Sequence, residues 1–344
     1  MDFLNIYLPI AETSFNALIL VAIGFSVGVL GCFFGVGGAW VVTPALNIFG
    51  FPMAYAIGTD LAHIFGKSIV ATAKHRKMGN VDMKMGVWSI IGSFIGVEAV
   101  AQVIMWLSKW GATAQNPEGY AGPVVRYSYM ILLFGLGFYM LYDYFTKDKR
   151  AAAKASTGVV AAPKKAWNLP PMIHFPASGI TISFLTVMGV FFFTGFLSGF
   201  LGVGGGFIRM PALIYLIGCP TAIAVGTDLF SVVFSGAYGC FTYGAKGAVD
   251  IIAAIYMLVG ASIGAQIGVT AVKYIRGYGI RILFAVMIIL AGIAVVLKQF
   301  GFKPYDAIVV MGGALGMCAI IIVRLWIGFQ KEKAEKAAGL PGLH

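Results

Sequence analysis

The sequence predicts an all-α polytopic membrane protein, made of two inverted-topology repeats of about five helical segments each and one C-terminal helix. Three observations predict this fold class. Of the 344 residues, 60% are hydrophobic and 11% are charged, whereas soluble domains carry roughly 25% charged residues. Apolar runs such as 179–202 and 280–297 are long enough to cross about 30 Å of hydrocarbon as helices. Finally, four short motifs recur in the same order in both halves of the chain.

The recurring motifs define the two repeats. GVGGAWVVTPAL at 35–46 matches GVGGGFIRMPAL at 202–213. The other three pairs are AIGTDL (56–61) with AVGTDL (224–229), MGNVD (78–82) with KGAVD (246–250), and GSFIG (92–96) with GASIG (260–264). The offset is 167 residues for the first pair and 168 for the rest, so one residue is inserted between them.

Apolar segments then divide the chain into helices. We expect 15–34, 39–50, 53–73, 83–107 and 126–145 in the first unit, 179–201, 206–218, 221–243, 248–272 and 280–298 in the second, and an extra helix at 305–328. The corresponding regions are a first transmembrane repeat (1–145), a basic cytoplasmic linker (146–178), a second transmembrane repeat (179–300), and a final helix with a cytoplasmic tail (301–344). Segments 39–50 and 206–218 are too short to span untilted, which leaves open whether they cross or are re-entrant.

Positive charge predicts the orientation. The basic stretches are 73–84, 146–165, 273–281 and the tail after Leu325. If every segment crosses, all of them lie on one side, which the positive-inside rule assigns to the cytoplasm. The N-terminus then lies outside and the C-terminus in the cytoplasm. An odd number of crossings per unit makes the two units inverted, a plan found in many secondary transporters.

Clustered glycines separate the first two segments of each unit. Glycine allows backbone conformations and close approaches that other residues do not, and the helix that follows offers N–H groups to an anion. The candidate substrate-binding glycines are Gly35, Gly37, Gly38, Gly204, Gly205 and Gly206. The GSFIG and GASIG motifs are instead typical of tight packing between membrane helices.

Asp60, His63 and Lys67 form a polar stripe, because positions i, i+3 and i+7 share one face of a helix. The second unit places Asp228, Ser231 and Ser235 at the same offsets. Ionisable groups inside a membrane are costly and normally face a cavity or a partner. The stripe therefore predicts a site, with Thr59, Thr227, His63 and Lys67 binding substrate and Asp60 and Asp228 carrying a coupling ion. The alternative is an internal salt bridge that only fixes packing, and Lys67 could also snorkel to the cytoplasmic end.

Other charged residues have separate readings. Arg209 lies in an apolar neighbourhood, where its guanidinium either binds an oxyanion or pairs with Asp60 or Asp228. Glu98, in the fourth segment, is a second candidate for coupling to a proton or cation. Asp82 and Asp250 precede the fourth segments of their units and are expected to be helix N-caps.

The GVGG-x5-PAL block, the A-x-GT that follows and the basic loop ending in GNVD resemble the TauE/SafE sulfite exporter family. The resemblance covers both halves of the chain. It implies an inner-membrane carrier for small sulfur-containing anions such as sulfite or organosulfonates. Members of the family commonly carry a small polar residue where this sequence has Asp60 and Asp228.

We therefore expect a secondary transporter for a small oxyanion, coupled to a proton or to sodium, in the lipid bilayer. The alternatives are a cation-coupled carrier for another small solute and a passive anion channel. An enzyme is not expected, because HExxH and metal-spaced Cys/His clusters are missing from the sequence. The two GxSxG matches, GFSVG (24–28) and GASIG (260–264), lie inside apolar helical segments, whereas the catalytic motif needs a strand-to-helix turn. No cofactor and no nucleic-acid partner are expected, and the sequence does not predict the oligomeric state.

Overall fold

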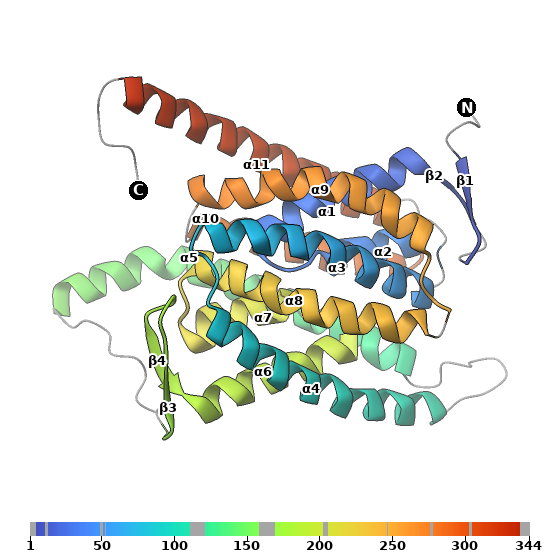
Figure 1. The fold of residues 1–344 in the computed structure, drawn as a ribbon, viewed down its shortest axis with the longest axis horizontal. Helices are drawn as coiled ribbons and strands as arrows, with labels where there is room; N and C mark the ends of the chain where they lie inside the picture. Colours follow the sequence, from blue (N-terminus) through green and yellow to red (C-terminus); the bar gives the residue numbers. More distant parts are fainter. Residues whose placement is uncertain are drawn as a thin grey trace.

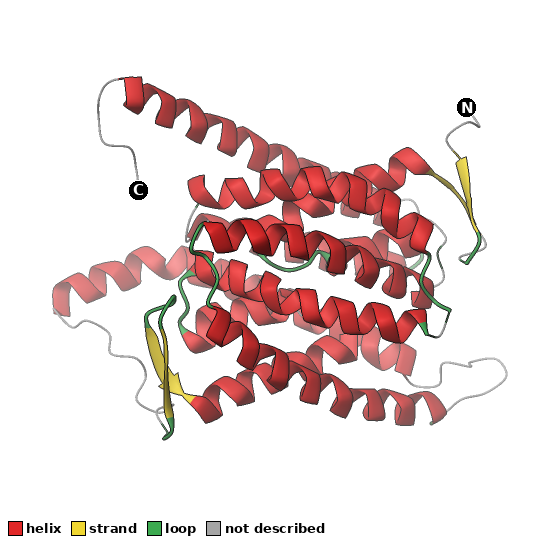
Figure 2. Ribbon diagram, in the orientation of Figure 1, coloured by secondary structure: helices red, strands yellow, loops and turns green. Residues whose placement is uncertain are grey.

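The computed structural model describes residues 5–10, 13–48, 51, 53–110, 121–157, 169–201, 206–245, 247–275, 278–302 and 305–337. These residues form a bundle of helices that run roughly side by side (Figures 1 and 2). The elements are β1 (Asn5–Leu8), β2 (Thr13–Asn16), α1 (Ala17–Phe34), α2 (Ala39–Ile48), α3 (Met53–Lys77), α4 (Met83–Lys109), α5 (Ala121–Thr157), β3 (Met172–Phe175), β4 (Ile180–Ser183), α6 (Phe184–Leu201), α7 (Gly206–Ala212), the π-helix η3 (Leu213–Ile217), α8 (Thr221–Gly244), α9 (Ile251–Tyr274), α10 (Tyr278–Gln299) and α11 (Tyr305–Ala337).

The helical fold class is confirmed. Among the described residues, five helices are long and apolar enough to cross a membrane, namely Ala17–Phe34, Thr221–Gly244, Ile251–Tyr274, Gly279–Gln299 and Tyr305–Ala334. The predicted segments all recur as helices, with boundaries that differ by a few residues at most ends. α3 is not one of the five, because its polar stripe lowers its hydropathy. The chain is a polytopic helical membrane protein.

A β-hairpin precedes each unit, which the sequence pattern did not predict. β1 pairs antiparallel with β2, with Ile6 opposite Phe15. β3 pairs antiparallel with β4, with Ile173 opposite Ile182. These residues correspond to one another at the offset of 167, so the repeat begins before the apolar segments do. The two hairpins lie at opposite ends of the helix bundle (Figure 1), and we call these the β1–β2 end and the β3–β4 end.

The region expected to be a linker, 146–178, is partly regular structure. α5 continues to Thr157, because Arg150, Lys154 and the three alanines between them favour a helix even though the stretch is basic. β3 then occupies Met172–Phe175. The part between, 158–168, lies outside the described residues.

Helices of one unit pack on helices of the other. α1 packs on α9 and α4 packs on α6, while α3 packs on α8 and α5 on α10. The glycine motifs make the first two contacts close. A Cβ built at Gly92 would lie 2.7 Å from the Phe191 Cβ on α6, and one at Gly264 would lie 2.8 Å from the Val29 backbone nitrogen on α1. The helix-packing prediction for GSFIG and GASIG is therefore confirmed.

The short segments turn back into the bundle. α2 has 10 residues, which as an α-helix extend about 15 Å, half of what a crossing requires. The start of α2 lies beside Lys67, and Thr43, further along, contacts Asp60, so α2 runs antiparallel to α3. α2 thus returns toward the end where α3 begins (Figure 1). It is too short to cross by itself, whereas α1 is one of the helices long and apolar enough to do so.

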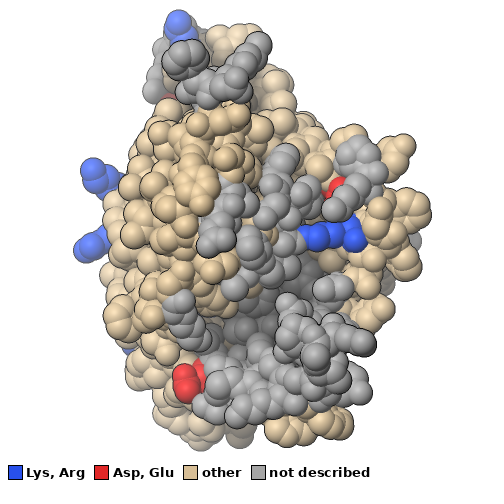
Figure 3. All heavy atoms as spheres, turned by 90° about the vertical axis from the view of Figure 1, so that its right-hand side faces the viewer, with Lys and Arg blue, Asp and Glu red and all other residues tan. Residues whose placement is uncertain are grey.

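Charge is distributed unevenly between the two ends. Lys74, His75, Arg76 and Lys77 occupy the last turn of α3, at the β3–β4 end. The opposite end, which carries the β1–β2 hairpin, presents mostly uncharged side chains over the described surface (Figure 3).

Candidate functional site

A turn of glycines joins α1 to α2 inside the bundle. Gly35, Gly37 and Gly38 have φ values of 80°, 68° and 91°, a region that other residues adopt only with strain. Gly35 caps α1 by donating its N–H to the Gly31 carbonyl, a common helix ending for glycine. The conformational reason for the GVGG motif is thus confirmed in the first unit.

This glycine turn lies between the third helices of the two units. A Cβ built at Gly37 would lie 3.1 Å from Val232 on α8 and 3.4 Å from Ile64 on α3. Gly206, at the start of α7, approaches the Val36 backbone so closely that its Cβ would lie 2.6 Å from the Val36 oxygen. The glycine motifs of the two units therefore meet. Gly204 and Gly205 lie outside the described residues.

The Lys67 ammonium points into the glycine turn. Lys67 is 0% exposed, and a Cβ built at Gly38 or Gly31 would lie 2.8 or 3.0 Å from its Nζ. Its one hydrogen bond among the described residues goes to the Val27 carbonyl, at a distance of 3.4 Å. An ammonium group has three donors, and no carboxylate of the described part of the chain forms an ion pair with it. Lys67 does not snorkel; it is a buried cation aimed at a helix start.

Asp60 is held by two side chains. The Thr43 hydroxyl on α2 donates to Asp60 Oδ2 at 3.1 Å, and His63 Nδ1 lies 3.4 Å from Asp60 Oδ1. The predicted i, i+3 relationship is therefore real. His63 Nε2 has no hydrogen-bond partner within the described residues. The Nε2 side of the buried His63 ring thus remains available to a proton or a ligand.

Arg209 pairs with Asp228 in the second unit. Arg209 Nη1 lies 3.3 Å from Asp228 Oδ1, and both side chains are fully buried. Of the two readings of Arg209, the structure shows the pairing. Arg209 Nε makes no hydrogen bond to any residue that the structure describes, so the guanidinium keeps donor capacity. In both units, the aspartate of the GTD motif is thus contacted by the short helix of the same unit.

The remaining candidates lie elsewhere. Glu98 is exposed on α4 and does not join the buried cluster. The hydroxyl oxygens of Thr59 and Thr227 accept hydrogen bonds from the backbone N–H of Asp250 and Asp82, both at 2.9 Å. Those contacts connect the two units, and a role of either threonine in binding substrate stays a prediction.

Sequence reasoning missed two hydroxyl residues near the stripes, Thr43 on α2 and Ser89 on α4. Thr43 directly precedes the proline of the duplicated PAL block, a position that could have marked it. Ser231, the counterpart of His63, contacts Ser89 of α4 through their hydroxyls and donates to the Thr227 carbonyl. Only the fold brings Ser89 to this place. Among the described residues, no group of three or more His, Cys, Asp or Glu could hold a metal ion.

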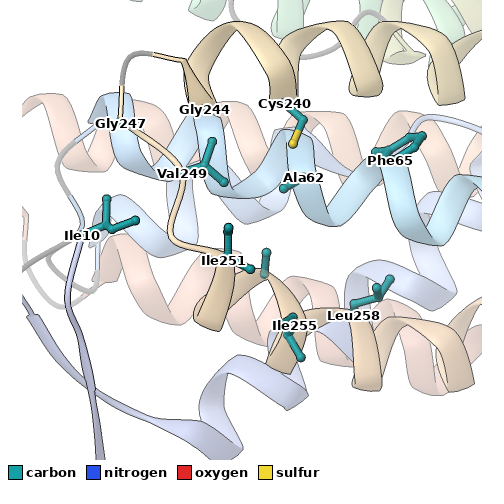
Figure 4. Close-up of a pocket in the computed structure, with 11 residues that line it drawn as sticks. Ile10, Ala62, Phe65, Cys240, Gly244, Gly247, Val249, Ile251, Ile255 and Leu258 are labelled. Atoms are coloured by element: carbon teal, nitrogen blue, oxygen red, sulfur yellow. The ribbon is translucent and has the colours of Figure 1, made fainter.

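A cleft of about 390 Å³ lies between α3, α8 and α9 near the β1–β2 end (Figure 4). Its walls are apolar and include Ala62, Phe65 and Cys240. The counterpart of Ala62 in the second unit is Phe230, whose ring packs against Gly86 of α4. The cleft exists because Ala62 does not fill the corresponding space. None of the charged residues of the stripe lines it, so it is separate from the polar site.

Comparison with known proteins identifies the family. The family model for "Sulfite exporter TauE/SafE" matches residues 20–295, which include both glycine motifs and both GTD motifs. The chain belongs to the TauE/SafE family. It is a membrane transporter rather than an enzyme, as the family and its relatives are.

Curated TauE/SafE-type relatives resemble the chain over most of its length. The probable membrane transporter protein YunE of Bacillus subtilis is 26% identical over 284 residues, which are 80% of this chain and 95% of YunE. YjnA of the same organism, also named a probable membrane transporter protein, is 25% identical over 72% of this chain and 87% of its own. A probable membrane transporter protein of Methanocaldococcus jannaschii is 28% identical over 60% of this chain and 66% of its own. No solved structure matches the chain.

Proposed function

We propose that this TauE/SafE protein is a secondary transporter that moves a small sulfur-containing oxyanion, of the sulfite or organosulfonate type, across the cytoplasmic membrane. The observation that carries the proposal is the buried Lys67 ammonium at the glycine turn. A buried cation is costly unless it is paired and hydrogen-bonded. A negatively charged substrate would supply the missing partner, and the family description, sulfite exporter, supports a sulfur oxyanion.

The start of α2 complements Lys67. The first N–H groups of a helix lack intrahelical acceptors and lie at the positive end of its dipole. α2 begins at Ala39, directly after Gly38, whose Cβ position is 2.8 Å from Lys67 Nζ. An oxyanion placed there would accept from the ammonium and from backbone N–H groups together. The glycines permit a small anion to approach the backbone closely.

Asp60 and His63 are the proposed coupling residues. Asp60 lies on the same stripe as Lys67, about two turns closer to the β1–β2 end, and contacts both Thr43 and His63. A proton or a sodium ion bound here would offset the charge of the substrate during its passage. The Arg209–Asp228 pair occupies the corresponding place in the second unit, and we propose that it opens to offer its cation to the substrate.

Transport by alternating access is supported by the way the units contact each other. α1 packs on α9 as α6 packs on α4, and the two hairpins lie at opposite ends. An inverted repeat would produce such reciprocal contacts, with the substrate site between the units. The basic last turn of α3 supports a cytoplasmic β3–β4 end under the positive-inside rule. We therefore propose that the N-terminus lies outside and the C-terminus in the cytoplasm.

Flux measurements in proteoliposomes test this function. We expect uptake of radiolabelled sulfite or a short-chain organosulfonate to be driven by an imposed proton or sodium gradient. Replacing Lys67 by glutamine should abolish this uptake. Lys84→Gln is the matched control, because the Lys84 side chain is exposed and its ammonium donates to the His174 carbonyl at the surface.

The same assay separates the alternatives. A proton- or sodium-dependent current without any anion requirement would indicate a cation-coupled carrier of another solute. Anion flux that never exceeds the electrochemical gradient of the anion would indicate a passive channel. Undiminished sulfite uptake by Lys67→Gln would contradict the anion site.

A further inference from the structure

A buried aspartate at each end of the bundle joins one unit to the other. Asp82 caps α4, since its Oδ1 accepts the Met85 N–H at 3.1 Å, which confirms the capping prediction. Its Oδ2 accepts from the N–H and the hydroxyl of Ser178, at 3.1 and 2.8 Å. Its own N–H donates to the Thr227 hydroxyl. Ser178 and Thr227 both belong to the second unit.

Asp250 repeats this arrangement at the other end. Its Oδ1 accepts the Ala253 N–H at 3.0 Å and so caps α9. Its Oδ2 accepts the Ile10 N–H at 3.3 Å, and its own N–H donates to the Thr59 hydroxyl at 2.9 Å. Ile10 and Thr59 both belong to the first unit. Asp250, Ala253 and Thr59 are the counterparts, at an offset of 168, of Asp82, Met85 and Thr227. Ile10, like Ser178, lies in the turn of the hairpin that precedes its unit.

These contacts exceed what a helix cap requires. A cap uses one side-chain oxygen and the helix's own N–H groups. In both groups the second oxygen and the backbone N–H reach across to a hairpin and a third helix of the other unit. Neighbouring glycines press the units together there, because Cβ atoms at Gly226 and Gly58 would run into the backbone oxygens of Asn80 and Ala248.

We propose that Asp82 and Asp250 are the gating residues of the transporter, one for each membrane face. We call Asp82, Ser178 and Thr227 the Asp82 latch, and Asp250, Ile10 and Thr59 the Asp250 latch. This inference rests on the proposed function, because a carrier must open one end while the other stays closed. Any rocking of one unit against the other that opens an end must separate the latch at that end. Both latches are formed here, as a state closed at both ends would require.

The test removes each latch while keeping its helix cap. Ser178→Ala with Thr227→Val removes partners of the Asp82 latch, and Thr59→Val removes a partner of the Asp250 latch. Thr72→Val is the control, because the Thr72 hydroxyl is buried on α3 without a hydrogen-bond partner among the described residues. Ser178→Ala alone is a milder variant should the double variant fail to fold.

The readout is the accessibility of a cysteine beside each latch, in a full-length background without native cysteines. Val81 and Val249 directly precede the two aspartates and are 8% and 5% exposed. Each is replaced by cysteine and labelled with a membrane-impermeant maleimide, added to either face of oriented vesicles.

Loss of the Asp82 latch should raise labelling at Val81→Cys about fivefold from the cytoplasmic face. Loss of the Asp250 latch should raise labelling at Val249→Cys from the outer face. A change of this size is expected because a lost hydrogen bond shifts the equilibrium between closed and open states by about two- to tenfold. Thr72→Val should change neither. Equal labelling of all variants, or a rise at both ends together, would overturn the proposal. Labelling needs no substrate, so it is independent of the flux assay. If labelling changes as expected while no sulfite flux is measured, the proposed substrate is wrong and the gating role of Asp82 and Asp250 still holds.

Discussion

The His63 imidazole lies 3.4 Å from the Asp60 carboxylate, and both side chains are buried one turn apart on α3. In this pair one imidazole nitrogen is fixed by the carboxylate, and the other has no partner within the described residues. The pair can therefore exchange a proton or bind a cation without a rearrangement of the helix. We expect it to determine coupling rather than substrate affinity.

Asp60→Asn keeps the shape of the carboxylate and removes its charge. We expect this variant to bind sulfite with unchanged affinity but to lose accumulation driven by a proton or sodium gradient. Binding is measured by a thermal shift with sulfite, and coupling by flux with and without an imposed gradient. Asp306→Asn, on α11, is the control, because the Asp306 carboxylate accepts the N–H of the adjacent Ala307 and lies outside the stripe. Gradient-driven accumulation by Asp60→Asn would contradict a coupling role.

Lys67→Met should stabilise the protein while it abolishes transport. A buried charge without a carboxylate partner is expensive, and replacing even a buried ion pair by apolar residues of similar volume often stabilises a protein by about 1–4 kcal/mol. The measurement is the thermal unfolding midpoint in detergent, with flux measured in parallel. A lower midpoint would show that the ammonium has a structural partner. Lys84→Met should leave the midpoint nearly unchanged.

The Arg209–Asp228 pair should show strong coupling in a double-mutant cycle. Removing one partner of a buried ion pair leaves the other charge uncompensated and typically costs about 3–5 kcal/mol. We therefore expect Arg209→Met and Asp228→Leu to be strongly destabilised singly and much less so together. The free energy of unfolding of the two single variants and the double variant is measured by unfolding in denaturant. Additive effects would mean that the contact at 3.3 Å contributes little energy.

Gly38→Ala should be far more damaging than Gly79→Ala. Both glycines have a positive φ, 91° and 71°, so both substitutions add backbone strain of roughly 1–2 kcal/mol. A Cβ at Gly79 meets nothing within 4 Å, whereas one at Gly38 collides with Val27 and lies 2.8 Å from Lys67 Nζ. Gly38→Ala should lower the unfolding midpoint further and eliminate sulfite flux. Equal effects of the two substitutions would show that the close approach of Val27 and Lys67 to Gly38 matters little.

Cys240 should be the cysteine that reacts with a small apolar maleimide in the membrane. It lines the apolar cleft and is partly exposed, whereas Cys32, Cys219 and Cys318 are buried. Ala62→Phe would place an aromatic ring where the second unit has Phe230, and should reduce the labelling. Ile263→Phe, on the exposed face of α9, is the control. Mass spectrometry identifies the labelled residue, and modification of Cys32 would contradict the packing described here.

The repeats make most of this architecture predictable. Matching motifs in the two halves are enough to locate the glycine turn, the third helices and the capping aspartates along the chain. The hairpins escape prediction because strands of four residues leave too little alternation to detect. The helical part of the linker escapes because its residues are polar, although polar residues such as lysine favour helices as strongly as many apolar ones.

The site is less predictable than the fold, because it depends on which helix faces turn inward. A membrane helix is apolar on all sides, so its sequence does not separate a lipid-facing position from an interior one. Glu98 was grouped with Asp60 for this reason, yet it is exposed. The choice between two partners for Arg209 also required the fold, since Asp228 comes close only through the packing of α7 on α8.

The packing of α1 on α9 and of α4 on α6 bears on how the chain is made. The α1 helix is synthesised early, but α9, on which it packs, is synthesised more than two hundred residues later. The first half therefore cannot complete its own core before the second half is made. Contacts this distant in sequence favour slow maturation and exposure to quality control. We therefore expect the two halves to be obligate partners in biogenesis. Expressed as separate polypeptides, 1–157 and 169–344 should each be degraded when alone and should accumulate when produced together.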